Sequence, residues 1–210
     1  MTSDPAYEAV SKAKRQEESG NPKGAVQTLE DYLRTDPHNN KVRLELARII
    51  IYKLNDLDYG MMQLDAILDI DPENADALAA SATVLSKYKK HNKETQEKLD
   101  HLMKVRPDAN TYDLYAKFLK FQKGDFKAAA EMYRKAIELE PTRYEFHQNY
   151  SVLLLNDLKD YQAAKEELEV MLSMKPNDPK VKMAYDRLLR EKFDKQGNPR
   201  KSRFGLFRRP

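Results

Sequence analysis

Five prolines stand at almost constant spacing along the chain, and this regularity constrains the fold more than any other feature. Successive members are 35, 35, 34 and 35 residues apart. A period between about 20 and 50 residues is typical of arrays built from one repeated supersecondary unit. In such an array each repeat packs mainly against its neighbours. The spacing therefore predicts five repeats, which end at Pro37, Pro72, Pro107, Pro141 and Pro176.

Two small residues recur at fixed distances before these prolines. The first lies 24 or 25 residues before each proline, and the second lies 12 residues before it. Mostly large apolar residues follow the second position at four and seven residues, which places them on one stripe of a helix. Small side chains allow close approach of two helices, and proline cannot continue a helix. Each repeat is therefore predicted to be a helical hairpin. The small residues are Ala13, Ala47, Ala82, Ala116 and Ser151, then Ala25, Gly60, Thr95, Ala129 and Ala164.

The fourth repeat shows the pattern most completely. It has a Gly-Asp-Phe turn at 124–126, the small, aromatic and small residues Ala129, Tyr133 and Ala136, and a closing Leu-Glu-Pro at 139–141. This pattern resembles the tetratricopeptide repeat family over about residues 6–176. The resemblance implies an all-α, right-handed superhelix of about five helix-turn-helix repeats with a C-terminal capping helix. The implied boundaries are 6–37, 38–72, 73–107, 108–141 and 142–176, with a cap at 177–193 and a disordered basic tail at 194–210.

One departure from the family pattern concerns the turn inside each hairpin. The two small positions are 12 residues apart in the first repeat, as in the family, but 13 apart in the other four. We therefore expect one extra residue at the turn between the two helices of each later repeat.

In tetratricopeptide arrays the first helix of each hairpin lines a concave groove, so the resemblance implies a binding surface there. Residues two and three before the first small position, and one after it, should face this groove; the rule also selects Leu44 and Ala80. Such a mixed surface suits an extended peptide or a helical segment of a partner protein, and Arg48 or Lys117 could meet a carboxylate. Solvated helix faces are the alternative interpretation. The predicted groove residues are Glu45, Arg48, Asp113, Lys117, Gln148 and Asn149, together with Phe121 as an aromatic anchor.

Chaperone-binding members of the family hold a carboxylate with a clamp. The clamp has Lys and Asn four residues apart in one repeat, Asn in the next, and Lys and Arg four apart in the third. Here Asn149 stands in its slot, but Asp113 and Lys117 stand where Lys and Asn are needed. Lys180 is followed by Ala184 instead of Arg. We therefore expect no chaperone carboxylate clamp.

The end of the chain is basic. The last sixteen residues carry six positive side chains and no negative one, whereas the whole chain has a net charge of +3, so the remainder is mildly acidic. Basic residues and aromatics can contact nucleic acid or anionic lipid. They can also form a short motif for a protein groove or a solubilising extension. Predicted tail contacts are Arg200, Lys201, Arg203, Phe204, Phe207, Arg208 and Arg209.

Catalytic and metal-binding patterns find little support. The six glycines leave no glycine-rich phosphate loop, and no two of the four histidines lie three or four residues apart. Asp69, Asp71 and Glu73 resemble the start of a calcium loop, but its twelfth position is Ala80 instead of a bidentate Glu. The chain has no cysteine. We expect no enzymatic activity, no cofactor and no metal site.

Two functions follow from these observations. The first is a non-enzymatic scaffold or adaptor that binds a partner protein in the groove. The alternative is a membrane- or nucleic-acid-associated assembly factor that is anchored by the tail. No apolar stretch of about 18 residues is present and cysteine is absent, which is compatible with a cytoplasmic protein. Leu189 and Phe193 on the capping helix could remain exposed and provide an oligomer contact, or a folded-back tail could cover them.

Overall fold

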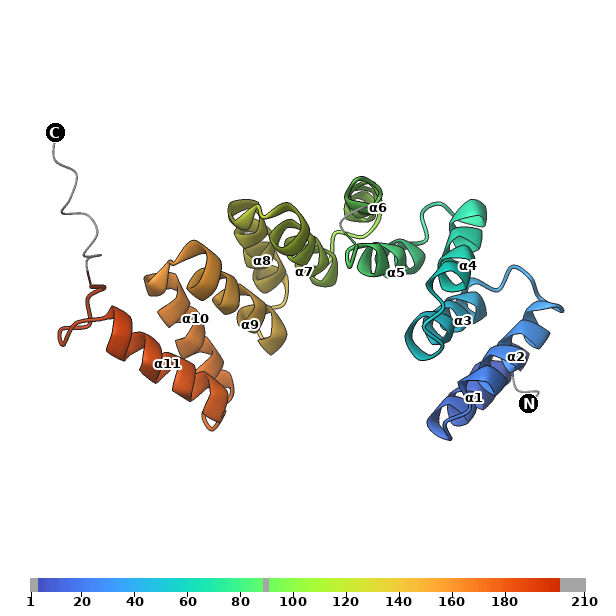
Figure 1. Ribbon diagram of the computed structural model, residues 1–210, viewed down its shortest axis with the longest axis horizontal. Coiled ribbons are helices and arrows are strands. Elements are labelled where there is room, and N and C mark those ends of the chain that lie inside the picture. The colour runs from blue at the N-terminus through green and yellow to red at the C-terminus, as the bar shows by residue number, and fades with distance from the viewer. Residues whose placement is uncertain (1–3, 89–90, 201–210) are drawn as a thin grey trace. The chain divides into compact units, whose positions relative to one another are not determined.

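The protein is described by a computed structural model that covers residues 4–88 and 91–200 (Figure 1). Within these residues it is built from eleven α-helices and two short π-helical segments, so the predicted all-α class is confirmed. The chain divides into two compact parts, Met1–Pro107 and Asp108–Pro210, which we call the N-terminal half and the C-terminal half.

The N-terminal half consists of three helical hairpins. The two helices of each hairpin pack against one another. Pro37, Pro72 and Pro107 each follow the second helix of a hairpin, as the repeat predicts. Asparagine or aspartate caps five of the six helices, since a side-chain oxygen accepts a backbone N–H of the first turn. The pairs are α1 (Pro5–Glu18) with α2 (Pro22–Leu33), α3 (Asn40–Lys53) with α4 (Leu57–Ile70), and α5 (Ala75–Leu85) with α6 (Asn92–Val105).

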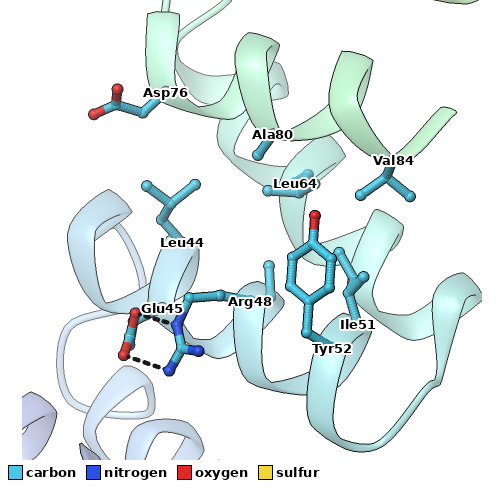
Figure 2. A pocket seen from close by; sticks show the side chains of 10 residues that line it. Leu44, Glu45, Arg48, Ile51, Tyr52, Leu64, Asp76, Ala80 and Val84 are labelled. Carbon is cyan, nitrogen blue, oxygen red and sulfur yellow. Dashed lines mark hydrogen bonds and ion pairs between the residues drawn. The ribbon is translucent and has the colours of Figure 1, made fainter. Parts of the chain in front are cut away.

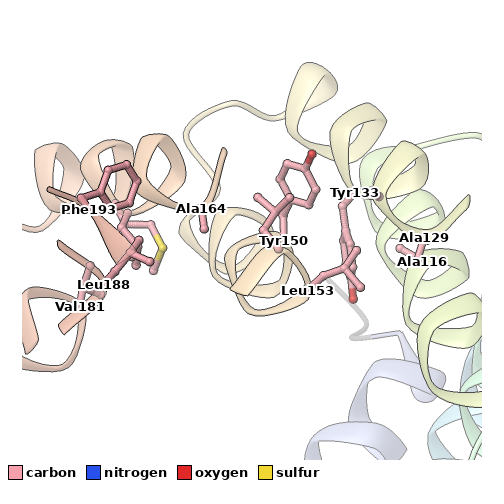
Figure 3. Close-up of a cluster of buried hydrophobic side chains, with 13 residues drawn as sticks. Ala116, Ala129, Tyr133, Tyr150, Leu153, Ala164, Val181, Leu188 and Phe193 are labelled. Carbon is pink, nitrogen blue, oxygen red and sulfur yellow. The ribbon is translucent and has the colours of Figure 1, made fainter. Parts of the chain in front are cut away.

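The C-terminal half consists of two hairpins and a final helix. Its core is a cluster of buried side chains from α7 to α11, in which the largest fully buried residue is Tyr133 (Figure 3). Tyr150, Leu153 and Leu188 contribute to the same cluster. The elements are α7 (Ala109–Phe118) with η2 (Leu119–Lys123), α8 (Phe126–Leu139), α9 (Tyr144–Leu153) with η3 (Leu154–Leu158), α10 (Tyr161–Met174) and α11 (Pro179–Lys192).

In the second, fourth and fifth repeats the extra residue lies at the turn between the two helices, as predicted. In the fourth repeat the Asp125 N–H donates to the Leu119 carbonyl at 3.0 Å, six residues back, so the first helix ends in a widened π turn. The residue before this aspartate is left-handed, with φ of 68° at Gly124. The second and fifth repeats have the same bond over six residues and a left-handed residue before the aspartate, and the fifth also has a π-helical segment, η3. There the bonds run from Asp56 to Ile50 and from Asp160 to Leu154, both at 3.1 Å, after Asn55 and Lys159 with φ of 55° and 59°.

The chain after α11 folds back on that helix. Residue Phe193 is 2% exposed and belongs to the core cluster, and Leu189 packs against the same cluster. The expectation that Phe193 supplies an exposed oligomer contact is therefore wrong, because its ring is needed in the core. Arg200 donates its backbone N–H to Lys192 and its Nε to the Phe193 carbonyl, both at 2.7 Å.

Residues 194–200 therefore form a hydrogen-bonded turn, although the sequence placed them in a disordered tail. Within the turn, the Asp194 N–H donates to the Asn198 carbonyl at 2.9 Å. The other predicted tail contacts, Lys201, Arg203, Phe204, Phe207, Arg208 and Arg209, lie outside the described residues.

Candidate functional site

A hollow of about 290 Å³ opens between α3 and α5 in the N-terminal half (Figure 2). Both helices are the first helices of their hairpins, which is where the resemblance placed the groove. The side chains that face the hollow recur every four residues on each helix, so they form one stripe. The lining comprises Leu44, Glu45, Ala47, Arg48, Ile51 and Tyr52 from α3, Leu64 from α4, and Asp76, Ala80 and Val84 from α5.

The floor of this hollow is apolar and its rim is charged. The methyl side chain of Ala80 leaves space opposite Leu44, and the Tyr52 ring stands at one side of the opening, 49% exposed (Figure 2). The Lys87 Nζ lies 4.9 Å from the centre of that ring, within the range of a cation–π contact. If a partner segment placed an apolar side chain in the hollow, that side chain would be removed from water, while the backbone of the segment would remain near the polar groups of the rim.

A second hollow of about 760 Å³ lies between α1 and α3. It shares the lining residue Glu45 with the first, so the two hollows lie next to each other along α3, and we refer to them together as the groove over α1, α3 and α5. This second part is more polar than the first. Its lining includes Asp4, Tyr7, Tyr32, Asp36, Lys41 and Glu45.

An ion-pair network lies beside the junction of the two hollows. Arg48 donates to both oxygens of Glu45, at 2.9 and 3.0 Å, and to both oxygens of Glu17 on α1. Lys53 Nζ lies 3.1 Å from Glu17 as well. The hydrogen bond from Arg48, with that from Lys53 and the two positive charges, lowers the pKa of Glu17 from 4.5 to about 2, although burial opposes this. Arg48 is therefore already paired, and a partner carboxylate would have to compete with two carboxylates of the protein itself.

The Glu17 network predicts a specific acid sensitivity. Because the folded-state pKa lies below the unfolded value, the network stabilises the fold fully above pH 4.5 and loses this effect as the pH falls towards 2. We expect Glu17→Gln to be less stable than the wild type at pH 7, with a difference that shrinks between pH 4.5 and 2. Urea midpoints of the two proteins, measured across this pH range, test the prediction. A difference between the two midpoints that stays constant with pH would contradict the lowered pKa of Glu17.

The predicted groove residues of the C-terminal half meet one another in part. Asp113 is 7% exposed, accepts a hydrogen bond from Asn149 Nδ2 at 2.8 Å, and pairs with Lys117 Nζ at 2.5 Å. Gln148 is exposed on the same helix as Asn149. Phe121 is 65% exposed, and Lys120 Nζ lies 5.0 Å from its ring centre. The structure thus joins Asp113, Lys117 and Asn149 into one polar cluster, and leaves Phe121 on the surface of η2.

Among the residues that line the α3–α5 hollow but were not selected from the sequence are Tyr52, Asp76 and Val84. Tyr52 follows Arg48 by four residues, and Asp76 and Val84 flank Ala80 at the same spacing. Extending each predicted stripe by one helical turn would have found all three.

The described residues hold no group of three His, Cys, Asp or Glu side chains suited to a metal ion. Over the same part of the chain, no helix has the length and apolar character that a membrane span requires.

Comparison with known proteins supports the repeat assignment. Residues 120–188 match the tetratricopeptide repeat family. A search of curated protein sequences gives no match. Among solved structures, MamA from Desulfovibrio magneticus RS-1 is similar with a TM-score of 0.68 and 19% identity, over 85% of this chain and 99% of MamA.

Two further solved structures are similar to the chain. One is TTC0263, a tetratricopeptide repeat protein of Thermus thermophilus, with a TM-score of 0.66 and 16% identity over 88% of this chain and 98% of that one. The other is PilW, described as a type IV pilus biogenesis factor, with a TM-score of 0.72 and 14% identity over 90% and 94%. At these identities the likeness is evidence for the fold.

Proposed function

Because the chain is a tetratricopeptide repeat protein, we propose that it is a non-enzymatic scaffold that binds a segment of a partner protein in the groove over α1, α3 and α5. The observation that carries this proposal is the α3–α5 hollow, which combines an apolar floor with a charged rim. Protein interaction is the common use of this repeat fold.

The size and lining of the hollow favour a protein segment over a small molecule. Small-molecule sites typically enclose roughly 300–1,000 Å³ and bury most of the ligand. The α3–α5 hollow lies just below this range, at about 290 Å³, and has a more polar hollow beside it. This arrangement suits one anchoring apolar side chain, with the rest of the partner segment lying along α3 towards α1.

The polar cluster of Asp113, Lys117 and Asn149 offers a second, more polar contact region in the C-terminal half. Together with Gln148 and Phe121 it remains a proposed contact surface. The buried carboxylate of Asp113 is compensated by its two neighbours, so Lys117 and the exposed Gln148 are the members that a partner could reach.

Alanine substitution of Tyr52 tests the proposed function. An exposed aromatic at the edge of an apolar hollow is a typical binding hot spot, and its truncation should weaken partner affinity at least tenfold, equivalent to about 1.4 kcal/mol. Met62→Ala on α4 is the matched control, because Met62 is 57% exposed and does not line the groove. The measurement is affinity capture of partners from native lysate by the full chain and both variants. Equal capture by both variants would contradict a site at the α3–α5 hollow.

A further inference from the structure

We propose that the groove of one copy of the chain binds the C-terminal segment, residues 201–210, of another copy. This inference rests on the proposed function, since it names an occupant for the same groove. It implies that the chain associates with itself head to tail, and that a partner protein must compete with this contact.

The composition of the segment is complementary to the lining of the hollow. Its sequence is Lys-Ser-Arg-Phe-Gly-Leu-Phe-Arg-Arg-Pro, with four positive side chains and no acidic one. Three large apolar side chains, Phe204, Leu206 and Phe207, lie between Arg203 and Arg208. An apolar anchor flanked by guanidinium groups requires an apolar hollow with carboxylates beside it.

The groove provides such a surface. Leu44, Tyr52 and Val84 bound the apolar hollow, and the carboxylates of Glu45 and Asp76 lie on its rim (Figure 2). The Asp76 side chain keeps 64% of its surface exposed even though it pairs with Arg106.

Carboxylates and cations alternate along the groove. Lys87 lies over the Tyr52 ring and Arg106 pairs with Asp76, so the exposed carboxylates of Asp76 and Asp4 are the groups that a basic occupant could reach. Asp4 and Asp36 extend the acidic character into the adjoining hollow, where Lys41 is the opposing cation. The positive charge of Arg48 is offset by Glu17 and Glu45, so it repels an arginine only weakly.

The segment is also long enough for this contact. It begins directly after Arg200, which is fixed to the end of α11 by its bonds to Lys192 and Phe193. Ten extended residues span at most about 33–36 Å. Packed helices are about 8–10 Å apart, so the segment can cross both α3 and α5. A contact of this heterologous type joins copies into chains or rings.

A peptide-binding experiment tests the contact. The receptor is the full chain with Phe204, Leu206 and Phe207 changed to serine, so that its own segment cannot occupy the groove. A labelled peptide of residues 201–210 should bind it saturably by fluorescence anisotropy. The peptide with the same three serines keeps all four cations and should bind at least tenfold more weakly. Adding Tyr52→Ala to the receptor should weaken binding at least tenfold, whereas Met62→Ala should not change it.

Sedimentation of the full chain completes the test. The wild type should self-associate with rising concentration, whereas the triple-serine chain and the Tyr52→Ala chain should remain monomeric. The inference is overturned if the wild type is monomeric throughout, or if the serine peptide binds as well as the native one. If the peptide does not bind but Tyr52→Ala still weakens partner capture, this inference alone is rejected. If Tyr52→Ala leaves partner capture unchanged, the proposed function is rejected.

Discussion

Replacement of Tyr133 by alanine should lower the free energy of unfolding of the C-terminal half by about 3–5 kcal/mol. Tyr133 is 1% exposed and lies on α8 within the core cluster, close to Tyr150, whose ring centre is 6.3 Å away (Figure 3). Its removal takes away a large buried surface and leaves a cavity that two helices cannot easily close. In a repeat array this loss also weakens the contact between neighbouring hairpins.

Urea unfolding followed by circular dichroism measures the effect of Tyr133→Ala. Phe121→Ala is the control in the same half, since this aromatic is 65% exposed and its truncation should change stability by no more than about 0.5 kcal/mol. If both variants lost the same stability, Tyr133 would not occupy the core position assigned to it.

Replacement of Gly60 by leucine should destabilise the N-terminal half by about 2–3 kcal/mol. Gly60 occupies the second small position of its repeat, where α4 packs against Ile51 of α3. A Cβ atom built on Gly60 would lie 2.2 Å from Ile51 Cγ1 and 3.4 Å from the Ile51 backbone nitrogen. A larger side chain therefore has to displace α3 itself. Because Ile51 also lines the α3–α5 hollow, the same variant should weaken partner binding.

The matched control for Gly60→Leu is Met62→Leu, which introduces the same side chain two residues away at a 57% exposed position. We expect its thermal midpoint to stay at the wild-type value, while that of Gly60→Leu falls. An unchanged midpoint for Gly60→Leu would show that the two helices are not as close as described.

The hairpin architecture was predictable because its determinants are local and periodic. Ala47 and Ala82 are completely buried where the sequence placed small residues between helices, and the prolines follow the second helix of each pair. The spacing of 13 residues between small positions also identified the turn that carries an extra residue. The sequence did not reveal how that residue is accommodated, because the widened turn is defined by backbone hydrogen bonds, and the left-handed position is filled by a favoured residue type in two of these repeats but by lysine in the third. Asn55, Gly124 and Lys159 all adopt the left-handed conformation.

The candidate site was only partly predictable, because it depends on contacts between repeats. Arg48 was identified as a groove residue, but its partner Glu17 lies 31 residues away and no local pattern joins them. The stripe rule found Leu44 and Ala80 but stopped one helical turn short of Tyr52.

The role of α11 at the end of the array also depends on one residue at a packing position. Asp186 stands on α11 eight residues after its N-cap Asp178, where α3 has Ala47 after its N-cap Asn39, and it is exposed. A carboxylate at a helix-packing position supports our proposal that α11 caps the array, since a further hairpin would bury that charge.

Site-specific photocrosslinking tests the central claim that the groove over α1, α3 and α5 binds a protein segment. A photoreactive phenylalanine derivative would replace Tyr52 in the hollow or Met62 outside it, and adducts formed in native lysate would be mapped by mass spectrometry. We predict that position 52 yields discrete adducts, each mapped to one segment of a protein, and that position 62 yields none of them. The same adducts from both positions, or none from position 52, would contradict the account.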